Sequence, residues 1–358
     1  MPLVAHSNLP TFERLKEEGQ TILSPNRALE QDVRELHIGL LNMMPDAALS
    51  ATERQFLRLV GQSNQIAQFY IHLTSLPELD RGPEARAHID KFYRPLEELK
   101  TEGLDALIIT GANVTQPVLS KEPFWEPLID VIHWAGKSVT STLCSCLATH
   151  AVLDFQYGKK RQHLEQKQWG VYSHRVVDRT HPLVRAVNTR FDVPHSRFNT
   201  VTRKQFEESG LHVLVESDEA GVHMAVSADG FRVVFLQGHP EYDTVSLLKE
   251  YKREIDLHQA GQRKTAPPFP ENYLSPGQQA ILDEYRQKHS ETRDQGETQP
   301  EFPEELILSR IHNTWHDTAE SFVARWIGKV YQLTHQDRLQ PFMDGIDPKD
   351  PLNWLKSR

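Results

Sequence analysis

The sequence has 358 residues, of which 38% are hydrophobic and 25% are charged, as is typical of a globular protein that buries a substantial core without disulfides or metal ions. Its formal net charge of -9, without a basic patch, argues against binding to nucleic acid or to an anionic membrane surface. Residues 1–12 lack a positive segment followed by an apolar run, and no stretch approaches the ~20 apolar residues of a membrane helix, so we expect a soluble, cytoplasmic protein.

The first 35 residues are mixed and polar and contain several prolines, which indicates an arm or a short helix packed against the body. From residue 36 onward, apolar runs alternate with amphipathic segments. This alternation predicts a doubly wound, mostly parallel α/β sheet with right-handed crossovers and flanking helices. The predicted strands cover residues 36–44, 68–73, 105–110, 138–143 and 232–236, and the predicted helices cover residues 50–60, 84–100, 123–134 and 244–260.

The remaining segments are less regular. Residues 159–233 are rich in β-branched side chains and short turns, so we expect them either to extend the sheet or to form a flap over the site. Residues 261–303 are rich in proline and polar side chains, which is typical of a surface insert, with a short helix at residues 277–288. An amphipathic helix at residues 318–333 is expected to pack on the core or to form a dimer interface. We therefore divide the chain into an amino-terminal arm (1–35), a catalytic domain (36–260), the insert (261–303), and a carboxyl-terminal helix and tail that pack on the catalytic domain (304–358).

The only two cysteines, Cys144 and Cys146, lie two positions apart in an apolar segment. A disulfide that short would be strained, and the pair lacks the CxxC spacing of a metal site, so the useful question is whether one thiol is a nucleophile. The segment SVTSTLCSCLATH predicts a strand, a sharp small-residue turn and a helix, the arrangement that exposes a nucleophile at the carboxyl edge of a sheet. A helix N-terminus also favours a thiolate. Spacing does not separate the two thiols, but proximity to the helix start favours Cys146; a buried, inert thiol is the alternative.

A second strand end carries the segment VVFLQGHPEYD, in which His239 follows the strand and Glu241 lies two residues on. An imidazole that takes up a proton needs such a carboxylate to hold its tautomer and to stabilise its charged form. A His-Pro-Glu turn alone is more often structural, but two strand-end signals reinforce each other. We therefore expect Cys146, His239 and Glu241 to form a catalytic triad.

These residues resemble the elbow cysteine and the His-x-Glu of class I glutamine amidotransferases. The whole chain resembles their relatives, the homoserine O-acyltransferase family of methionine biosynthesis, over residues 34–253 and 315–334. The matching motifs are LLNMMP, TERQFLRLVG, FYRPLEELK, DALIITGA, SVTSTLCSC, WGVYSH, VPHSRFN, GHPEYD and EYKRE.

The resemblance implies an amidotransferase-like fold and a ping-pong transfer through an acyl-thioester on Cys146, with His239 as general base and Glu241 as its orienting residue. Backbone N–H groups near Cys146 and Leu147 would hold the oxyanion. The resemblance also implies a homodimer with no permanently bound cofactor and no metal. The positions that match the family's amino-acid-binding residues are Lys167, Ser196 and Arg253.

Position 115 matches the determinant of the acyl donor in this family. A glutamate there is associated with acetyl-CoA, since its charge would repel a succinyl carboxylate, but this chain has Thr115. We therefore expect succinyl-CoA as donor and L-homoserine as acceptor, with acetyl-CoA or L-serine as alternatives; the two acceptors differ by one methylene. The chain departs from the family after Pro45, where it has two additional residues and no lysine, so a contact of that loop with CoA is an open question.

Two alternative functions belong to other classes. A glutamine amidotransferase or hydrolase would employ the same triad, but the elbow SCLAT lacks the glycine and glutamine of GxCxGxQ and no second catalytic domain is recognisable. A noncatalytic binding protein would keep the fold, and would keep its function after a Cys146→Ala substitution. Measuring CoA release for each donor and acceptor pair distinguishes these possibilities.

Overall fold

The computed structural model describes residues 3–31, 33–64, 66–295 and 298–357. The strands are β1 (Leu3–Val4), β2 (Ile22–Leu23), β3 (Glu35–Leu41), β4 (Gln68–Thr74), β5 (Ala106–Ile109), β6 (Ser141–Ser145), β7 (Gln162–Val176), β8 (Arg190–Thr200), β9 (His212–Ser217), β10 (Gly221–Val226) and β11 (Val233–Leu236). The helices are α1 (Pro10–Glu17), α2 (Pro25–Leu29), α3 (Asp46–Gln62), α4 (Pro83–Phe92), α5 (Leu96–Glu102), α6 (Trp125–Ser138), α7 (Leu147–Tyr157), α8 (Arg203–Glu208), α9 (Ser246–Gln259), α10 (Pro276–Gln295), α11 (Glu304–Leu308) and α12 (His316–Leu333).

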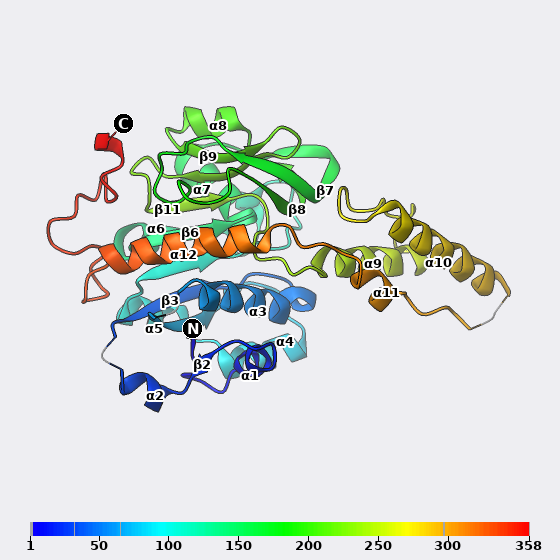
Figure 1. The fold of residues 1–358 in the computed structure, drawn as a ribbon, viewed down its shortest axis with the longest axis horizontal. Helices are drawn as coiled ribbons and strands as arrows, with labels where there is room; N and C mark the ends of the chain where they lie inside the picture. The colour runs from blue at the N-terminus through cyan, green and yellow to red at the C-terminus, as the bar shows by residue number, and fades with distance from the viewer. Residues whose placement is uncertain (1–2, 32, 65, 296–297, 358) are drawn as a thin grey trace.

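One sheet runs through the molecule and is covered by helices on both faces (Figure 1). Within the described ranges its eleven strands pair in the order β2-β1-β4-β3-β5-β6-β11-β10-β9-β7-β8. The pairs from β2 to β11 are parallel, and those from β11 to β8 are antiparallel. The predicted α/β sheet with flanking helices is therefore confirmed, and the parallel part ends at the pair that carries the predicted nucleophile and base.

Strand β5 is apolar throughout because both of its faces are buried. In β5, Ala106 and Ile108 belong to the apolar cluster that contains the buried faces of α1, α3 and α12. Leu107 and Ile109 belong instead to the cluster formed with α5, α6 and α7. Figure 1 shows α3 and α12 side by side across one face of the sheet, so α12 is a core helix, one of its two expected roles.

The predicted single helix at residues 84–100 is wrong, because the chain forms α4 and α5 there with a break between them. Pro95 disfavours a helical conformation for the residue before it, Arg94. The N–H of Arg94 bonds instead to the carbonyl of Leu73 at the end of β4, at 2.8 Å. The apolar spacing continues across this proline, but the helix does not: α4 ends before Pro95 and α5 begins after it.

Three irregular segments also take a definite form. Residues 159–233 extend the sheet through β7, β8, β9 and β10. The first 35 residues contain α1, as expected, and also add β1 and β2 to the sheet edge beside β4. The helix predicted at residues 277–288 is the longer α10, whose Leu282 and Tyr285 pack with Tyr251 of α9 in a third apolar cluster. Figure 1 shows α9, α10 and α11 together at one end of the molecule, where α10 reaches furthest from the sheet.

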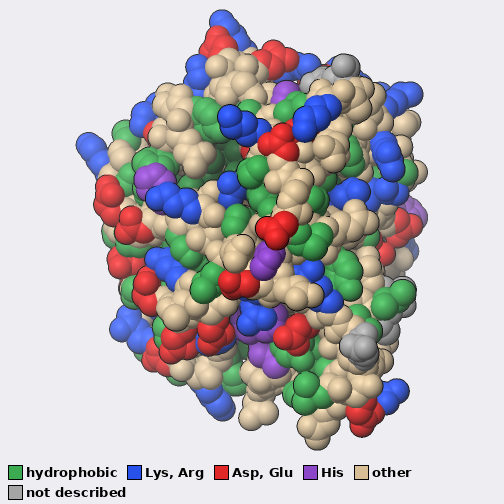
Figure 2. Space-filling model, turned by 90° about the vertical axis from the view of Figure 1, so that its left-hand side faces the viewer, with side chains coloured by type: hydrophobic (Ala, Val, Ile, Leu, Met, Phe, Trp, Pro, Cys, Tyr) green, Lys and Arg blue, Asp and Glu red, His purple; other side chains and the backbone are tan. Residues whose placement is uncertain are grey.

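The surface carries both signs of charge. On the face that Figure 2 shows, Lys and Arg side chains are interspersed with Asp and Glu and do not form one continuous field. Among the described helices, none combines the length and the apolar character that crossing a membrane requires.

Candidate active site

Cys146 occupies a strained turn between β6 and α7. Its φ of 51° and ψ of -106° lie in a region that residues other than glycine seldom adopt. Its side chain is partly exposed, whereas Cys144, inside β6, is 1% exposed and burial raises its pKa to about 12. Cys144 is therefore a buried, protonated thiol, and the sulfur available for chemistry is that of Cys146.

The pairing of β6 with β11 brings the two predicted strand ends together. The strands are parallel neighbours, with Ser145 opposite Leu236 at their carboxyl ends. The N–H of Cys146 donates to the carbonyl of Leu236 at 2.8 Å. The hydroxyl of Thr149, in the first turn of α7, bonds to the carbonyls of Cys144 and Leu236 at 2.8 and 3.0 Å. The elbow is thus tied through its main chain to the strand that leads to His239.

His239 is a buried imidazole that lies between the side chains of Cys146 and Glu241. Its Nδ1 lies 2.8 Å from Oε1 of Glu241, and it is also hydrogen-bonded to the side chain of Cys146. Burial alone lowers the pKa of His239, but the charges of Glu241 and Cys146 and their hydrogen bonds outweigh burial, so this pKa is raised well above its ordinary value. The structure thus brings the three predicted residues together, with the imidazole of His239 between the side chains of Cys146 and Glu241.

The turn that carries His239 is fixed by close packing. A Cβ at Gly238 would lie 2.6 Å from Cγ1 of Val193 and 2.7 Å from Nε2 of His195, so no larger residue fits there. The N–H of His239 donates to the carbonyl of Pro194 at 2.8 Å. The ring of Tyr242 stacks on the imidazole at a centroid distance of 4.5 Å.

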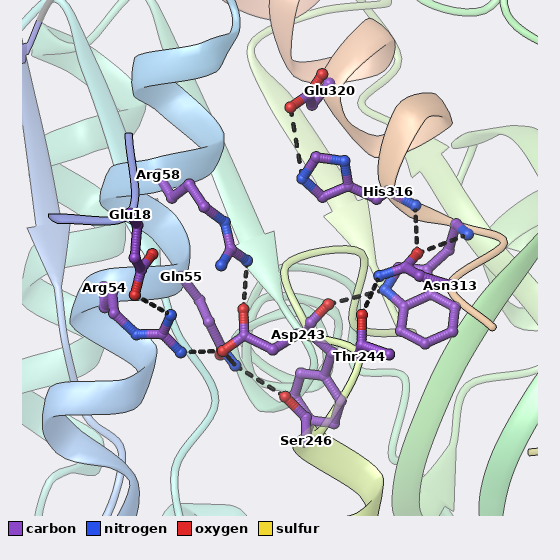
Figure 3. A network of polar contacts seen from close by, with 12 residues as sticks. Glu18, Arg54, Gln55, Arg58, Asp243, Thr244, Ser246, Asn313, His316 and Glu320 are labelled. Atoms are coloured by element: carbon purple, nitrogen blue, oxygen red, sulfur yellow. Dashed lines mark hydrogen bonds and ion pairs between the residues drawn. The ribbon is translucent and has the colours of Figure 1, made fainter. Parts of the chain in front are cut away.

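A polar network holds the next part of this loop (Figure 3). Asp243, two residues after Glu241, forms ion pairs with Arg54 and Arg58 of α3. The amide of Gln55 donates to Asp243 at 3.3 Å and to Ser246 at 2.9 Å. These side chains are mostly buried. They anchor the loop that carries His239 to α3, which precedes it by almost two hundred residues.

The carboxyl-terminal segment holds the same loop from its other side, as Figure 3 also shows. The amide of Asn313 donates to the hydroxyl of Thr244 at 3.1 Å. The indole N–H of Trp315 donates to the carbonyl of Tyr242 at 2.8 Å. The loop is therefore clamped between α3 and the start of α12.

Two of the predicted substrate-binding residues meet at a third residue, Glu250 of α9. The Oε2 of Glu250 lies 3.2 Å from Nζ of Lys167 and accepts a hydrogen bond from Ser196 at 2.6 Å. It also accepts one from the indole of Trp169 at 2.9 Å, and its Oε1 accepts one from Tyr242 at 2.7 Å. Burial alone would raise the pKa of Glu250, but the charge of Lys167 and these hydrogen bonds lower it, so Glu250 is a carboxylate. The sequence reasoning missed Glu250, although it begins the quoted motif EYKRE.

Arg253 lies one turn further along α9, at the surface. Its side chain is 50% exposed and its Nη2 is 3.8 Å from Oε1 of Glu254. Among the described contacts, none joins Arg253 to Lys167 or Ser196. The structure therefore groups two of the three predicted residues and leaves Arg253 beside the group.

Thr115 lies in the loop that follows β5. Its N–H and that of Gln116 donate to Oε1 of the buried Glu122 at 2.7 and 2.6 Å, and its hydroxyl donates to Oε2 at 3.2 Å. The same loop starts beside the elbow, because a Cβ at Gly111 would lie 3.6 Å from Cβ of Cys146.

The loop after Pro45 has a cation nearby despite its missing lysine. Nη1 of Arg81 donates to the carbonyl of Met44 at 2.5 Å and to Asp46 at 3.3 Å. In the described part of the chain, no group of three or more His, Cys, Asp or Glu is placed to hold a metal ion.

Comparison with known proteins gives one consistent result. A family model described as homoserine O-succinyltransferase matches residues 2–336. The homoserine O-succinyltransferases of Allochromatium vinosum and Nitrosococcus oceani are each 65% identical over 98% of this chain and cover 99% and 98% of their own length. That of Cardiobacterium hominis is 49% identical over 99% of this chain and all of its own. Among solved structures, a glutamine amidotransferase from Thermotoga maritima aligns with a TM-score of 0.46 and 12% identity, over 83% of this chain and 98% of its own.

Proposed function

The chain belongs to the homoserine O-succinyltransferase family and is an acyltransferase of methionine biosynthesis, and from this premise we propose that it carries the succinyl group as a thioester on Cys146. In this proposal the donor is succinyl-CoA and the acceptor is L-homoserine. The observation that carries the proposal is the buried imidazole of His239, which contacts the side chains of Cys146 and Glu241 at once.

His239 moves the proton in both half-reactions. We place the proton on His239 in the free enzyme, because the pKa of this imidazole is raised well above its ordinary value, and the Cys146 sulfur attacks as its thiolate. The thiolate attacks the thioester carbonyl of succinyl-CoA, a new C–S bond forms, and the CoA sulfur leaves with the proton of His239. His239 then removes the hydroxyl proton of homoserine, the oxygen attacks the enzyme thioester, and the Cys146 sulfur leaves as the thiolate. Glu241 orients the ring and stabilises its charged form throughout.

The oxyanion formed in each step requires backbone donors. The N–H of Cys146, one of the donors expected from the sequence, is already bonded to Leu236 and does not serve this purpose. The N–H of Leu147, the first residue of α7, has no acceptor within its own helix and is the donor we propose. Gly111 lies against Cys146, so its segment of backbone supplies a second wall of this site.

Homoserine is bound, in this proposal, by Lys167, Ser196 and Arg253. Lys167 and Arg253 supply cations for its carboxylate, and Ser196 supplies a hydroxyl. Glu250 acts as a positioning residue, because it holds Lys167 and Ser196 and also bonds to Tyr242, which stacks on His239. The acceptor subsite and the base are thereby linked through one carboxylate.

Thr115 fits a succinyl donor because it adds no negative charge to the loop beside the elbow.

We also propose that the enzyme is a cytoplasmic homodimer without a resident cofactor, and that residues 36–260 form its catalytic domain. The arm at 1–35, the insert at 261–303 and the segment 304–358 pack around that domain. Sedimentation of the purified protein at several concentrations tests the dimer.

The decisive experiment traps the thioester. The full-length protein is mixed with succinyl-CoA and no acceptor, and its intact mass and its peptides are measured. We expect one succinyl group on Cys146 and its removal when L-homoserine is added. The Cys144→Ala variant serves as the matched control and should acylate like the wild type.

The same preparation separates the alternatives. Acetyl-CoA and L-serine are tested as replacement substrates, and L-glutamine is tested for ammonia release. A protein that releases ammonia from glutamine but never gains a succinyl group would contradict the proposal. So would acylation of a residue other than Cys146.

A further inference from the structure

Arg161 is a half-buried cation in the segment between α7 and β7. Its guanidinium donates to the carbonyl of Gln116 at 3.4 Å from Nη2, a long hydrogen bond. Its Nε is buried and has no hydrogen-bond partner among the described residues. No described carboxylate forms an ion pair with it. A half-buried guanidinium that makes so few contacts with the protein has donors left for an anionic ligand.

This cation binds the loop after β5, which starts beside the reactive sulfur. The loop begins at Gly111, against Cys146, and continues to Thr115 and Gln116, where Arg161 binds its backbone. Burial lowers the pKa of Arg161, and the charges of Glu122 and Cys146 act in the opposite direction. The loop that Arg161 binds thus joins the elbow at Cys146 to the proposed donor-selecting position, Thr115.

The charged side chains near Arg161 have more of their hydrogen-bonding groups occupied by protein partners. Arg197 also interacts with Cys146, but its Nε, Nη1 and Nη2 donate to His195, to the carbonyl of Asn199 and to the carbonyl of Ala220. Glu122 is likewise occupied, since its oxygens accept three hydrogen bonds from Thr115 and Gln116. Within the described contacts, one donor of Arg161 has a partner against three of Arg197, so Arg161 keeps more of its five N–H donors for a ligand.

We propose that Arg161 binds the free carboxylate of the succinyl group and so selects succinyl-CoA over uncharged acyl donors. This inference rests on the proposed thioester at Cys146. Succinyl differs from a neutral chain of the same length by one carboxylate, which three C–C bonds of about 1.5 Å each separate from the thioester carbonyl. Thr115 removes an obstacle to that carboxylate, and Arg161 supplies the attraction, so the donor preference has both a permissive and a selective component.

The test compares two donors on Arg161→Met. Single-turnover acylation of Cys146 is measured with succinyl-CoA and with butyryl-CoA, whose chain has the same length and no charge. We expect the rate constant for succinyl-CoA divided by that for butyryl-CoA to fall about 10- to 100-fold, as for loss of a charge-assisted hydrogen-bonded pair. Arg161→Lys should restore part of the ratio. Lys160→Gln is the matched control, since Lys160 is the adjacent cation but pairs with Asp154, and its ratio should equal that of the wild type.

An unchanged ratio in Arg161→Met would overturn the inference. If this variant does not fold, protection experiments on the wild type decide. Succinate should slow alkylation of Cys146 by iodoacetamide at concentrations at which butyrate does not, and equal protection by the two would also overturn the inference. Failure of the proposed function looks different, because then neither donor acylates Cys146 in the wild-type protein.

Discussion

The two segments that meet at the active site are held in place by different means. The elbow at Cys146 is held by its main chain: a buried strand, a buried helix and a strained turn between them. The loop from Gly238 to Asp243 has no regular structure and is held by side chains that come from α3, α9 and the start of α12. The proposed nucleophile is therefore positioned by local folding, and the proposed base is positioned by the assembly of the whole chain. Substitutions in the two segments should therefore impair the enzyme in different ways.

The largest effect is expected at the elbow. Cys146→Ala removes the atom that forms the thioester, so succinyl transfer should fall by at least about 10⁴-fold, as for loss of other catalytic nucleophiles. Release of CoA in the presence of homoserine measures it. Cys144→Ala should stay near wild-type activity, since that thiol faces the core. Substantial activity in Cys146→Ala would instead favour direct transfer without a thioester.

In the base loop, Glu241→Gln tests the charge on His239. Loss of the carboxylate should lower kcat by about 10² to 10⁴-fold and lower the pKa of His239, which NMR titration of the imidazole measures. Because the folded-state pKa of His239 is raised, the stability from its proton is fully present below the unfolded pKa of ~6.5 and is lost as pH rises through the folded value. The Tm difference between wild type and variant should therefore be largest near pH 6 and shrink toward alkaline pH. A difference that grows with pH would contradict this assignment.

Glu250→Gln tests whether the acceptor subsite depends on one carboxylate. We expect kcat/KM for homoserine to fall about 10- to 100-fold, because Lys167 and Ser196 lose their common partner. Acylation by succinyl-CoA alone should change much less. Asp256→Asn is the matched control, because this acid lies on the same helix and is exposed. Equal losses in both half-reactions would mean that Glu250 acts through the base and not through the acceptor.

The smallest effect is expected from the anchor of the loop. Asp243→Asn leaves Arg54 and Arg58 without their shared anion, which should cost about 1 to 3 kcal/mol of stability and lower kcat by about 10-fold. Thermal unfolding and initial rates measure the two effects. Asp317→Asn, at a fully exposed acid on α12, is the control and should change neither. Loss of stability without loss of rate would show that the anchor supports the fold but not the base.

The parts that could be predicted from the sequence are those that depend on local patterns. Both predicted strand ends are present. Short apolar runs predict strands of this kind, and the run ALII of β5, for example, is buried on both faces. Pro95 also indicates the break between α4 and α5, although the apolar spacing continues across it. The roles of Glu250 and Arg161 were not readable. The proposed role of Glu250 depends on its contacts with Lys167 and Ser196, which the pairing of β7 with β8 brings together. That of Arg161 depends on its contact with a loop 45 residues earlier in the chain.

The two thiols differ in exposure, so their reactivities report on two different properties of the protein. A small thiol reagent can reach Cys146 in the native state, so the rate of that reaction reports whether the site is empty or acylated. Cys144, closed inside β6, becomes reactive only when that central strand detaches. Mass spectrometry of the two labels over time would thus follow occupancy of the site and opening of the sheet in one tube, with no introduced fluorophore.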